Sequence, residues 1–251
     1  MSLRPFAAGL LTLGLGLSWS PAALAQTLRA LTTDNYPPFE FRIEETAERP
    51  GVYGFDIELA ETIARNLGLQ IQFEIGGFEQ LLPRLITGQG DLAIAAISIT
   101  PERAQQVDFS EPYFEAQDSL VSLRSLPTDQ SLSGLKLGYI QGTVQAQQAT
   151  QLKTRYSTLQ LKSYADVTTL LKALTAREIN VALVESVVAN IFAQDDAQLI
   201  VQKLKGASLE RYAIAFPKGS PYREQFNREI RRLRNSGELT LMIRRWFAAQ
   251  Q

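Results

Sequence analysis

Residues that suit the binding of a carboxylate gather where a predicted strand, residues 91–97, runs into a predicted helix. Thr100 is a natural N-cap for that helix, Pro101 takes the first helical position, and Arg103 lies in the first turn. Free backbone N–H groups and the positive end of the helix dipole favour an anion at such a junction, and the guanidinium fork of Arg103 matches a carboxylate. Ser98 lies in the same stretch. The alternative is an ordinary strand-to-helix turn with a solvated arginine.

Two further residues, Asp34 and Phe78, also fall directly after predicted strands. Ligands of parallel sheets bind beyond the carboxyl ends of the strands, so these residues can share one rim with Ser98. Asp34, together with the flat faces of Tyr36 and Phe78, would suit a cationic group through ion pairing and cation–π attraction. Taken singly, the aromatic residues also suit a core, and Asp34 also suits the cap of a proline-containing turn.

The composition excludes several classes of function. The chain has 25 basic and 26 acidic residues and no long basic run, which argues against nucleic acid as a partner. It has no cysteine and no histidine, so thiolate metal sites, disulfides, a zinc site and a Ser-His-Asp triad are all excluded. We expect neither a cofactor nor a metal.

The first 25 residues have the pattern of a signal peptide. Arg4 is followed by an apolar stretch over residues 6–17, too short to cross a bilayer comfortably, and then by a small-x-small cleavage site at residues 23–25. No later stretch is long and apolar enough to span a membrane. We therefore expect an exported periplasmic protein, cleaved near Gln26 and without a lipid anchor, because there is no cysteine at the boundary.

From Thr27 onward strands and helices alternate, which predicts an α/β fold with mainly parallel sheets. A Ser-, Asp- and Gln-rich segment after Pro127 indicates a boundary, and a second alternating series follows it. Two lobes are expected, joined by crossings at residues 119–123 and 211–216. Lobe 1 would comprise residues 26–120 and 214–251, and lobe 2 residues 121–213.

A set of motifs in register along the chain resembles the amino-acid-binding proteins of ABC importers, the family 3 solute-binding proteins. The resemblance extends from Leu28 to Phe247. Within the family, the chain is most similar to the lysine/arginine/ornithine-, histidine- and glutamine-binding members. It implies a type II periplasmic binding protein fold, with two lobes that close on one amino acid. The motifs are Tyr36-Pro-Pro-Phe-Glu-Phe, Gly54-Phe-Asp-Ile, Ser98-Ile-Thr-Pro-Glu-Arg103, Asp108-Phe-Ser-Glu-Pro-Tyr-Phe114, Gln141-Gly-Thr143 and Ala215-Phe-Pro-Lys-Gly219.

The resemblance also implies roles for single residues. Arg103 and Ser98 would hold the α-carboxylate, joined by the loop of Thr143 from the second lobe. Glu185 would take the α-ammonium group, at a position where many members have Asp, and Asp34 would lie deep in the pocket. The full set of expected ligand-binding residues is Asp34, Tyr36, Phe78, Ala96, Ser98, Arg103, Thr143 and Glu185.

The main functional hypothesis is therefore capture of a polar, basic L-amino acid and its delivery to an ABC permease by a monomeric, non-enzymatic protein. The alternative is an enzyme similar to cyclohexadienyl dehydratases, in which Glu185 or Asp34 would act as general acid. A sensory ectodomain is a third possibility, but such domains are normally fused to a membrane helix or a catalytic module.

Overall fold

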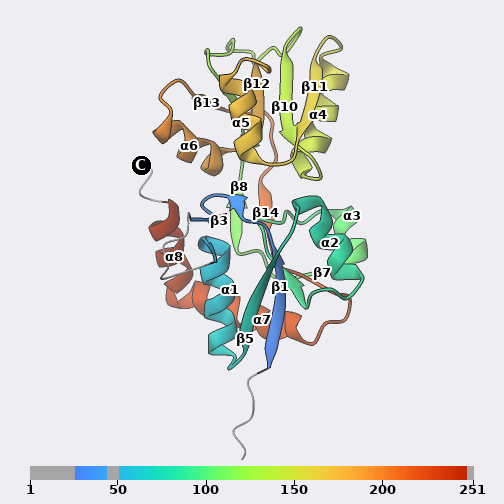
Figure 1. The fold of residues 1–251 in the computed structure, drawn as a ribbon, viewed down its shortest axis with the longest axis vertical. Coiled ribbons are helices and arrows are strands. Elements are labelled where there is room, and N and C mark those ends of the chain that lie inside the picture. Colours follow the sequence, from blue (N-terminus) through green and yellow to red (C-terminus); the bar gives the residue numbers. More distant parts are fainter. Residues whose placement is uncertain (1–25, 44–50, 248–251) are drawn as a thin grey trace, which may run out of the picture.

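Two lobes, each built on a five-stranded sheet, make up the part of the chain that the structure describes (Figure 1). The structure is a computed structural model that describes residues 26–43 and 51–247. The expected signal peptide, residues 1–25, lies outside the described residues. The predicted α/β architecture with two lobes is confirmed.

Lobe 1 has the strand order β5-β1-β6-β15-β7. Strand β1 pairs in parallel with β5 and β6, whereas β15 pairs antiparallel with β6 and β7. A small antiparallel sheet, β2-β3-β4, lies beside it. The strands are β1 (Thr27–Thr32), β2 (Asn35–Tyr36), β3 (Glu40–Arg42), β4 (Val52–Tyr53), β5 (Gln70–Ile75), β6 (Leu92–Ala93), β7 (Asp108–Phe109) and β15 (Ala215–Phe216).

Helices cover both faces of the lobe 1 sheet, because successive residues of a strand point to opposite sides. Leu28 and Ala30 of β1 belong to one hydrophobic cluster with α1, and Leu31 belongs to another with Leu81 and Leu85 of α2. The helices are α1 (Phe55–Asn66), α2 (Phe78–Ile86), α3 (Pro101–Gln106), α7 (Tyr222–Ser236) and α8 (Glu238–Phe247).

Lobe 2 repeats this plan with the strand order β11-β10-β12-β9-β13. Its first three strands are parallel, and β9 is antiparallel to β12 and β13. Helix α4 packs on one face of β12, and α5 and α6 pack on the other. The elements are β9 (Asp118–Ser122), β10 (Lys136–Ile140), α4 (Val144–Arg155), β11 (Gln160–Tyr164), α5 (Val167–Thr175), β12 (Val181–Glu185), α6 (Ser186–Asp195) and β13 (Ile200–Lys203).

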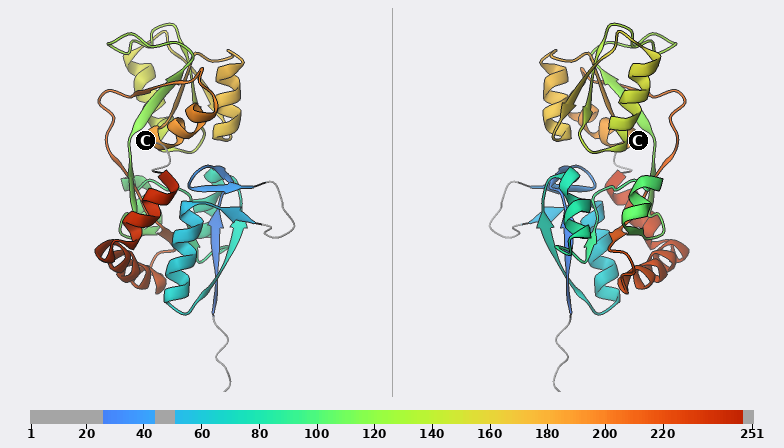
Figure 2. Two further views of the ribbon diagram at one scale, coloured as in Figure 1. Left: turned by 90° about the vertical axis from the view of Figure 1, so that its left-hand side faces the viewer. Right: turned by 90° about the vertical axis from the view of Figure 1, so that its right-hand side faces the viewer.

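The chain crosses between the lobes through a two-stranded ribbon, β8 (Phe114–Ala116) with β14 (Glu210–Tyr212). Figure 2 shows both connections on the same side of the molecule. The predicted crossings at residues 119–123 and 211–216 are therefore displaced: β9 lies inside the lobe 2 sheet, since all five of its residues are buried there. We propose lobe limits a few residues earlier than those given above, so that β9 lies wholly in lobe 2 and β8 and β14 form the crossings.

The predicted strand over residues 91–97 is shorter in the structure, where β6 ends at Ala93. Ala96 adopts a left-handed conformation with φ 46°, and its N–H donates to the Asp56 carboxylate at 2.7 Å instead of continuing the ladder. The Asp56 side chain thus satisfies the Ala96 N–H where the chain has left the sheet ladder.

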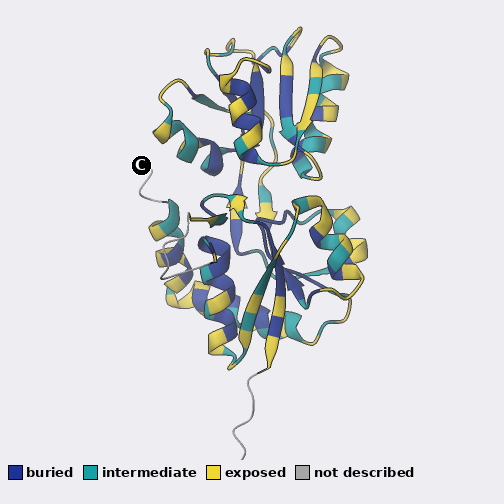
Figure 3. Cartoon of the chain, in the orientation of Figure 1, coloured by how far each residue is buried: buried dark blue, intermediate teal, exposed yellow. Residues whose placement is uncertain are grey.

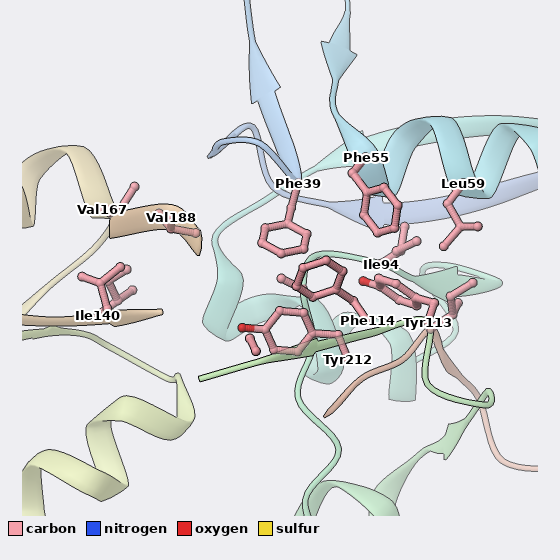
Figure 4. Packing of buried hydrophobic residues seen from close by; sticks show 14 of the residues in the cluster. Phe39, Phe55, Leu59, Ile94, Tyr113, Phe114, Ile140, Val167, Val188 and Tyr212 are labelled. Carbon is pink, nitrogen blue, oxygen red and sulfur yellow. The ribbon is translucent and has the colours of Figure 1, made fainter. Parts of the chain in front are cut away.

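Buried side chains are concentrated in the central strands and the inner faces of the helices (Figure 3). The largest hydrophobic cluster contains residues of both lobes, and its lobe 1 part is rich in aromatic rings (Figure 4). Phe39 lies edge-on to Phe114 and Tyr212, with ring centroids 5.1 and 5.5 Å away. This aromatic layer lies under the strand ends that face the other lobe. Within residues 26–43 and 51–247, every helix is too short or too polar to cross a bilayer.

Candidate functional site

A cavity lies between the two lobes and is lined by residues of both. Its volume is about 30 Å³. Lobe 1 contributes the strand ends and α2, and lobe 2 contributes the ends of β10, β11 and β12. The lining residues are Thr33, Asn35, Tyr36, Glu40, Phe78, Ala95, Ala96, Ser98, Arg103, Ile140, Thr143, Val144, Gln145, Ala165, Asp166 and Glu185.

Arg103 is the only cationic side chain among these lining residues. Thr100 caps α3 by accepting the N–H of Arg103 at 3.2 Å, which places the arginine one turn into the helix. Its guanidinium donates to the Ser98 carbonyl at 2.8 Å and, across the lobes, to the Gly142 carbonyl at 3.0 Å. Burial lowers the pKa of Arg103, but nearby Glu210, Tyr212 and Glu102 oppose this effect. Because α3 has six residues, the positive charge comes mainly from this fork of donors rather than from the helix dipole.

Two aromatic residues predicted for the site, Tyr36 and Phe78, line the cavity. Phe78 begins α2, and the guanidinium carbon of Arg103 lies 5.6 Å from its ring centroid. Tyr36 ends β2, and its hydroxyl donates to the Glu185 carboxylate of the other lobe. The Phe78 ring and the Tyr36 hydroxyl therefore each contact a charged group of the cavity.

Glu185 ends β12 and is buried at the floor of the cavity, 5% exposed. One carboxylate oxygen accepts from the Tyr212 hydroxyl at 2.9 Å and from the Gln145 amide at 2.9 Å, and the other accepts from Tyr36. Burial raises the pKa of Glu185, and hydrogen bonds from its own backbone and from Tyr212 counter part of that rise. A carboxylate with this number of donors is rigidly held.

Thr143 and Ser98 complete the predicted set on the two sides of Arg103. Thr143 is the N-cap residue of α4, and its hydroxyl donates to the Ile140 carbonyl at 2.8 Å. The Ser98 hydroxyl donates to Glu210 at 2.7 Å. Seven of the eight residues predicted for ligand binding line the cavity: Tyr36, Phe78, Ala96, Ser98, Arg103, Thr143 and Glu185.

Asp34, the eighth, is absent from the lining, so the structure does not bring it together with the other seven. Its carboxylate pairs with Arg42 at 3.0 Å on the outside of the small sheet, because the chain reverses between β2 and β3 and places the two side by side. The cavity instead receives Glu40 of β3, which is 1% exposed. The sequence feature that could have predicted this burial is the position of Glu40 between Phe39 and Phe41, in an otherwise apolar stretch.

One oxygen of Glu40 accepts from the Thr33 hydroxyl at 2.7 Å, and the other, Oε2, has no hydrogen-bond partner within residues 26–43 and 51–247. Burial and the negative charge of Asp56 raise the pKa of Glu40. Burial raises the pKa of Asp56 to about 7, against hydrogen bonds from the Ala96 N–H and the Tyr113 hydroxyl. The cavity therefore holds a desolvated acid with an unused acceptor, which a cation would satisfy.

No group of three or more acidic residues suited to a metal ion occurs in the described part of the chain. The arrangement is instead that of a zwitterion site, with a guanidinium fork on one side and buried carboxylates on the other. Such a site binds and orients a small charged molecule.

The comparisons with known proteins agree with this geometry. The family model described as bacterial extracellular solute-binding proteins, family 3, matches residues 28–249. The arginine-binding extracellular protein ArtP of Bacillus subtilis is 29% identical over 224 residues, covering 88% of this chain and 86% of that protein.

The structure is similar to that of the amino-acid ABC transporter substrate-binding protein AbpA of Streptococcus pneumoniae bound to L-arginine. The TM-score is 0.80 at 29% identity, covering 89% of this chain and 95% of that one. It also resembles the ancestral amino-acid-binding protein AncCDT-1, a precursor of cyclohexadienyl dehydratase, with a TM-score of 0.76, 24% identity, and coverage of 88% of this chain and 95% of that one. At that identity the likeness shows the fold alone.

Proposed function

Because the chain belongs to the bacterial extracellular solute-binding proteins of family 3, we propose that it captures one L-amino acid with a cationic side chain and delivers it to an ABC permease. The observation that carries the basic preference is the buried oxygen of Glu40 that has no hydrogen-bond partner in the described chain, in a cavity where Arg103 is the one cation among the described lining residues. Arg103 would take the α-carboxylate and Glu185 the α-ammonium group, which leaves Glu40 for the side chain. The arginine-binding relative and the arginine-bound structure support the class of ligand.

Closing of the lobes is the step that would couple capture to delivery. Arg103 and Tyr36 of lobe 1 contact Gly142 and Glu185 of lobe 2, so the polar contacts around the cavity join both lobes. A ligand held from both sides stabilises the closed form, because only that form makes all contacts. We propose that the closed surface of a monomer docks on the permease.

We propose no catalytic role for the site. The dehydratase alternative requires Glu185 or Asp34 as a general acid. Glu185 accepts hydrogen bonds from three side chains, and Asp34 is paired with Arg42 outside the cavity. Formation of product from prephenate or arogenate would overturn this part of the proposal.

A thermal-shift screen with the twenty common amino acids, ornithine and citrulline tests the proposed ligand class. A ligand at a hundred times its dissociation constant adds about 2.7 kcal/mol to the free energy of unfolding. We expect arginine, lysine or ornithine to raise the melting temperature, and citrulline, the neutral analogue of arginine, to raise it much less. Equal shifts with arginine and citrulline would contradict a role for side-chain charge.

Glu40→Gln is expected to weaken arginine binding by about thirtyfold or more, because removing one partner of a buried charge pair costs about 2–5 kcal/mol. Binding of a neutral amino acid, such as glutamine, should change little. Isothermal titration calorimetry measures both affinities.

Asp34→Asn is the matched control, since it also neutralises an acid but one that lies outside the cavity lining. We expect it to leave arginine binding within about threefold of the wild type, as is usual for exposed ion pairs. The opposite result, a loss of arginine affinity with Asp34→Asn and none with Glu40→Gln, would mean that Asp34 and not Glu40 binds the ligand side chain.

A further inference from the structure

Three acidic side chains surround a single amide at the junction of the two lobes, beside the cavity. The amide nitrogen of Gln145 lies 2.8 Å from Asp118 Oδ1, 2.9 Å from Glu185 Oε1 and 3.3 Å from Glu210 Oε1. Asp118 and Glu185 are buried, and Glu210 is half-buried. Glu185 and Gln145 line the cavity, whereas Asp118 and Glu210 are not among its lining residues.

This cluster of Asp118, Glu185, Glu210 and Gln145 lies where the lobes meet. Glu210 begins the connecting strand β14, and Asp118 follows the other connecting strand, β8, by two residues. Gln145 and Glu185 belong to lobe 2, whereas the second oxygen of Glu210 accepts the Ser98 hydroxyl of lobe 1. Separation of the lobes would pull these partners apart and expose Glu210 to water.

The charges in the cluster do not balance if all three acids are ionised. An amide has two hydrogens, and none of the three carboxyl groups forms a salt bridge within the described ranges 26–43 and 51–247. Turning the amide so that its oxygen faces the carboxyl groups would require more protons, not fewer.

The titratable groups that face Glu210 come from four elements. Asp118 of β9 and Glu185 of β12 repel a charge on it, Tyr212 of β14 is a neutral neighbour, and Arg103 of α3 is the cation that attracts it. Burial, Glu185 and Asp118 together raise the pKa of Glu210 to about 9. A hydrogen bond between Asp118 and Glu210 also contributes to this rise, and it acts in the opposite direction on Asp118.

We propose that Asp118 and Glu210 form a proton-binding site, and that closing of the lobes takes up one proton from solvent onto this pair. The proton binds the Glu210 carboxylate, and the resulting O–H group donates a hydrogen bond to Asp118. Gln145 can then donate to Glu185 in a cluster that carries two negative charges instead of three. The proposal rests on the closing motion of the proposed function and not on which amino acid binds.

The sign of the pH dependence follows from the raised pKa of Glu210. In the open form the solvated carboxyl group would have a pKa near its ordinary value of 4.5, against about 9 in the closed form. The closed form is therefore fully favoured below the lower value and loses up to about tenfold in population per pH unit between the two values. Amino-acid affinity should fall as the pH rises through this window.

Titration calorimetry with L-arginine in two buffers of different ionisation heat counts the protons taken up on binding. Between about pH 6 and pH 8 we expect the wild type to take up nearly one proton more than Glu210→Gln, and to lose up to about tenfold more affinity per pH unit. Proton release from Glu40 and titration of arginine itself act equally in both proteins and cancel in this difference. Asp118→Asn should remove the extra proton as well.

Glu115→Gln is the control, because Glu115 is an exposed acid on the partner strand β8, opposite Arg211. It should keep the proton uptake of the wild type. Equal proton counts in the wild type and Glu210→Gln would overturn the proposal.

Melting temperatures between about pH 5 and pH 9 give a second arm, with the protein closed on a saturating amino acid that the thermal-shift screen identifies. Stability of the closed wild type should fall relative to closed Glu210→Gln as the pH rises, since the closed chain holds the raised pKa, whereas the ligand-free, open proteins should give parallel curves. Parallel curves for the closed proteins would also overturn the proton site. If arginine gave no shift while the curves diverged with another amino acid, the proposed ligand class would fail and the proton site would stand.

Discussion

Arg103→Ala is expected to weaken binding of every amino acid by about a hundredfold or more, whatever its side chain. Arg103 is the only cation lining the cavity in the described chain, and its guanidinium also joins the lobes through the Gly142 carbonyl. Truncating one partner of a buried charge pair costs about 2–5 kcal/mol, and each 1.4 kcal/mol is about tenfold in affinity. Titration calorimetry with arginine and with glutamine measures the loss.

Two further variants separate the positive charge of Arg103 from its paired donors, and the effect on binding from an effect on protein stability. Arg103→Lys keeps the charge but not the paired donors, so we expect an intermediate affinity. Arg29→Ala removes an exposed arginine that pairs with Asp91 at 3.6 Å, and it should leave binding unchanged. An affinity of Arg103→Ala within about threefold of the wild type would mean that the α-carboxylate binds elsewhere.

Gly142→Ala is expected to lower amino-acid affinity by about tenfold or more through the contact between the lobes. Gly142 has φ 79°, and a Cβ added there would lie 2.9 Å from the Glu79 Cβ and 3.3 Å from its Cα, at the start of α2 in the other lobe. A helix backbone yields little, and forced overpacking costs about 1–3 kcal/mol. The closed form carries this cost, whereas the open form does not.

Gly134→Ala is a close control because Gly134 lies in the same lobe with φ 73° and has no atom within 4 Å of an added Cβ. Both variants place alanine in a left-handed conformation, so both should lose about 1 kcal/mol of stability in the free protein. Only Gly142→Ala should then lose affinity. Equal affinities for the two variants would show that the bound form does not bring Gly142 against Glu79.

Local chemistry in the sequence determined most of the elements and one side of the site. Thr100 and Pro101 start α3 as predicted, and the apolar spacing of residues 57–67 and 167–174 corresponds to helices α1 and α5. The order of strand and helix, together with the position of Arg103 after a strand, was enough to predict an anion-binding rim. These features depend on neighbours within a few residues, which the sequence lists directly.

Contacts between distant segments decided the rest. Asp34 and Glu40 lie six positions apart, and only the pairing of β2 with β3 turns one toward Arg42 and the other into the cavity. The Ala96 N–H, just after β6, bonds to Asp56, which lies 40 residues away in the sequence.

For residues 95–103, the sequence alone therefore predicted a cation, Arg103, beside the end of a strand. The place of this stretch as one wall of the cavity between the lobes was decided by tertiary structure. Gly142 and Glu210 reach Arg103 and Ser98 from 39 and 112 residues away, and no local pattern predicts such contacts. The physical reason is that the energy of a buried charge depends on which groups surround it in space, and that set is defined only when the two sheets and their connecting ribbon have folded.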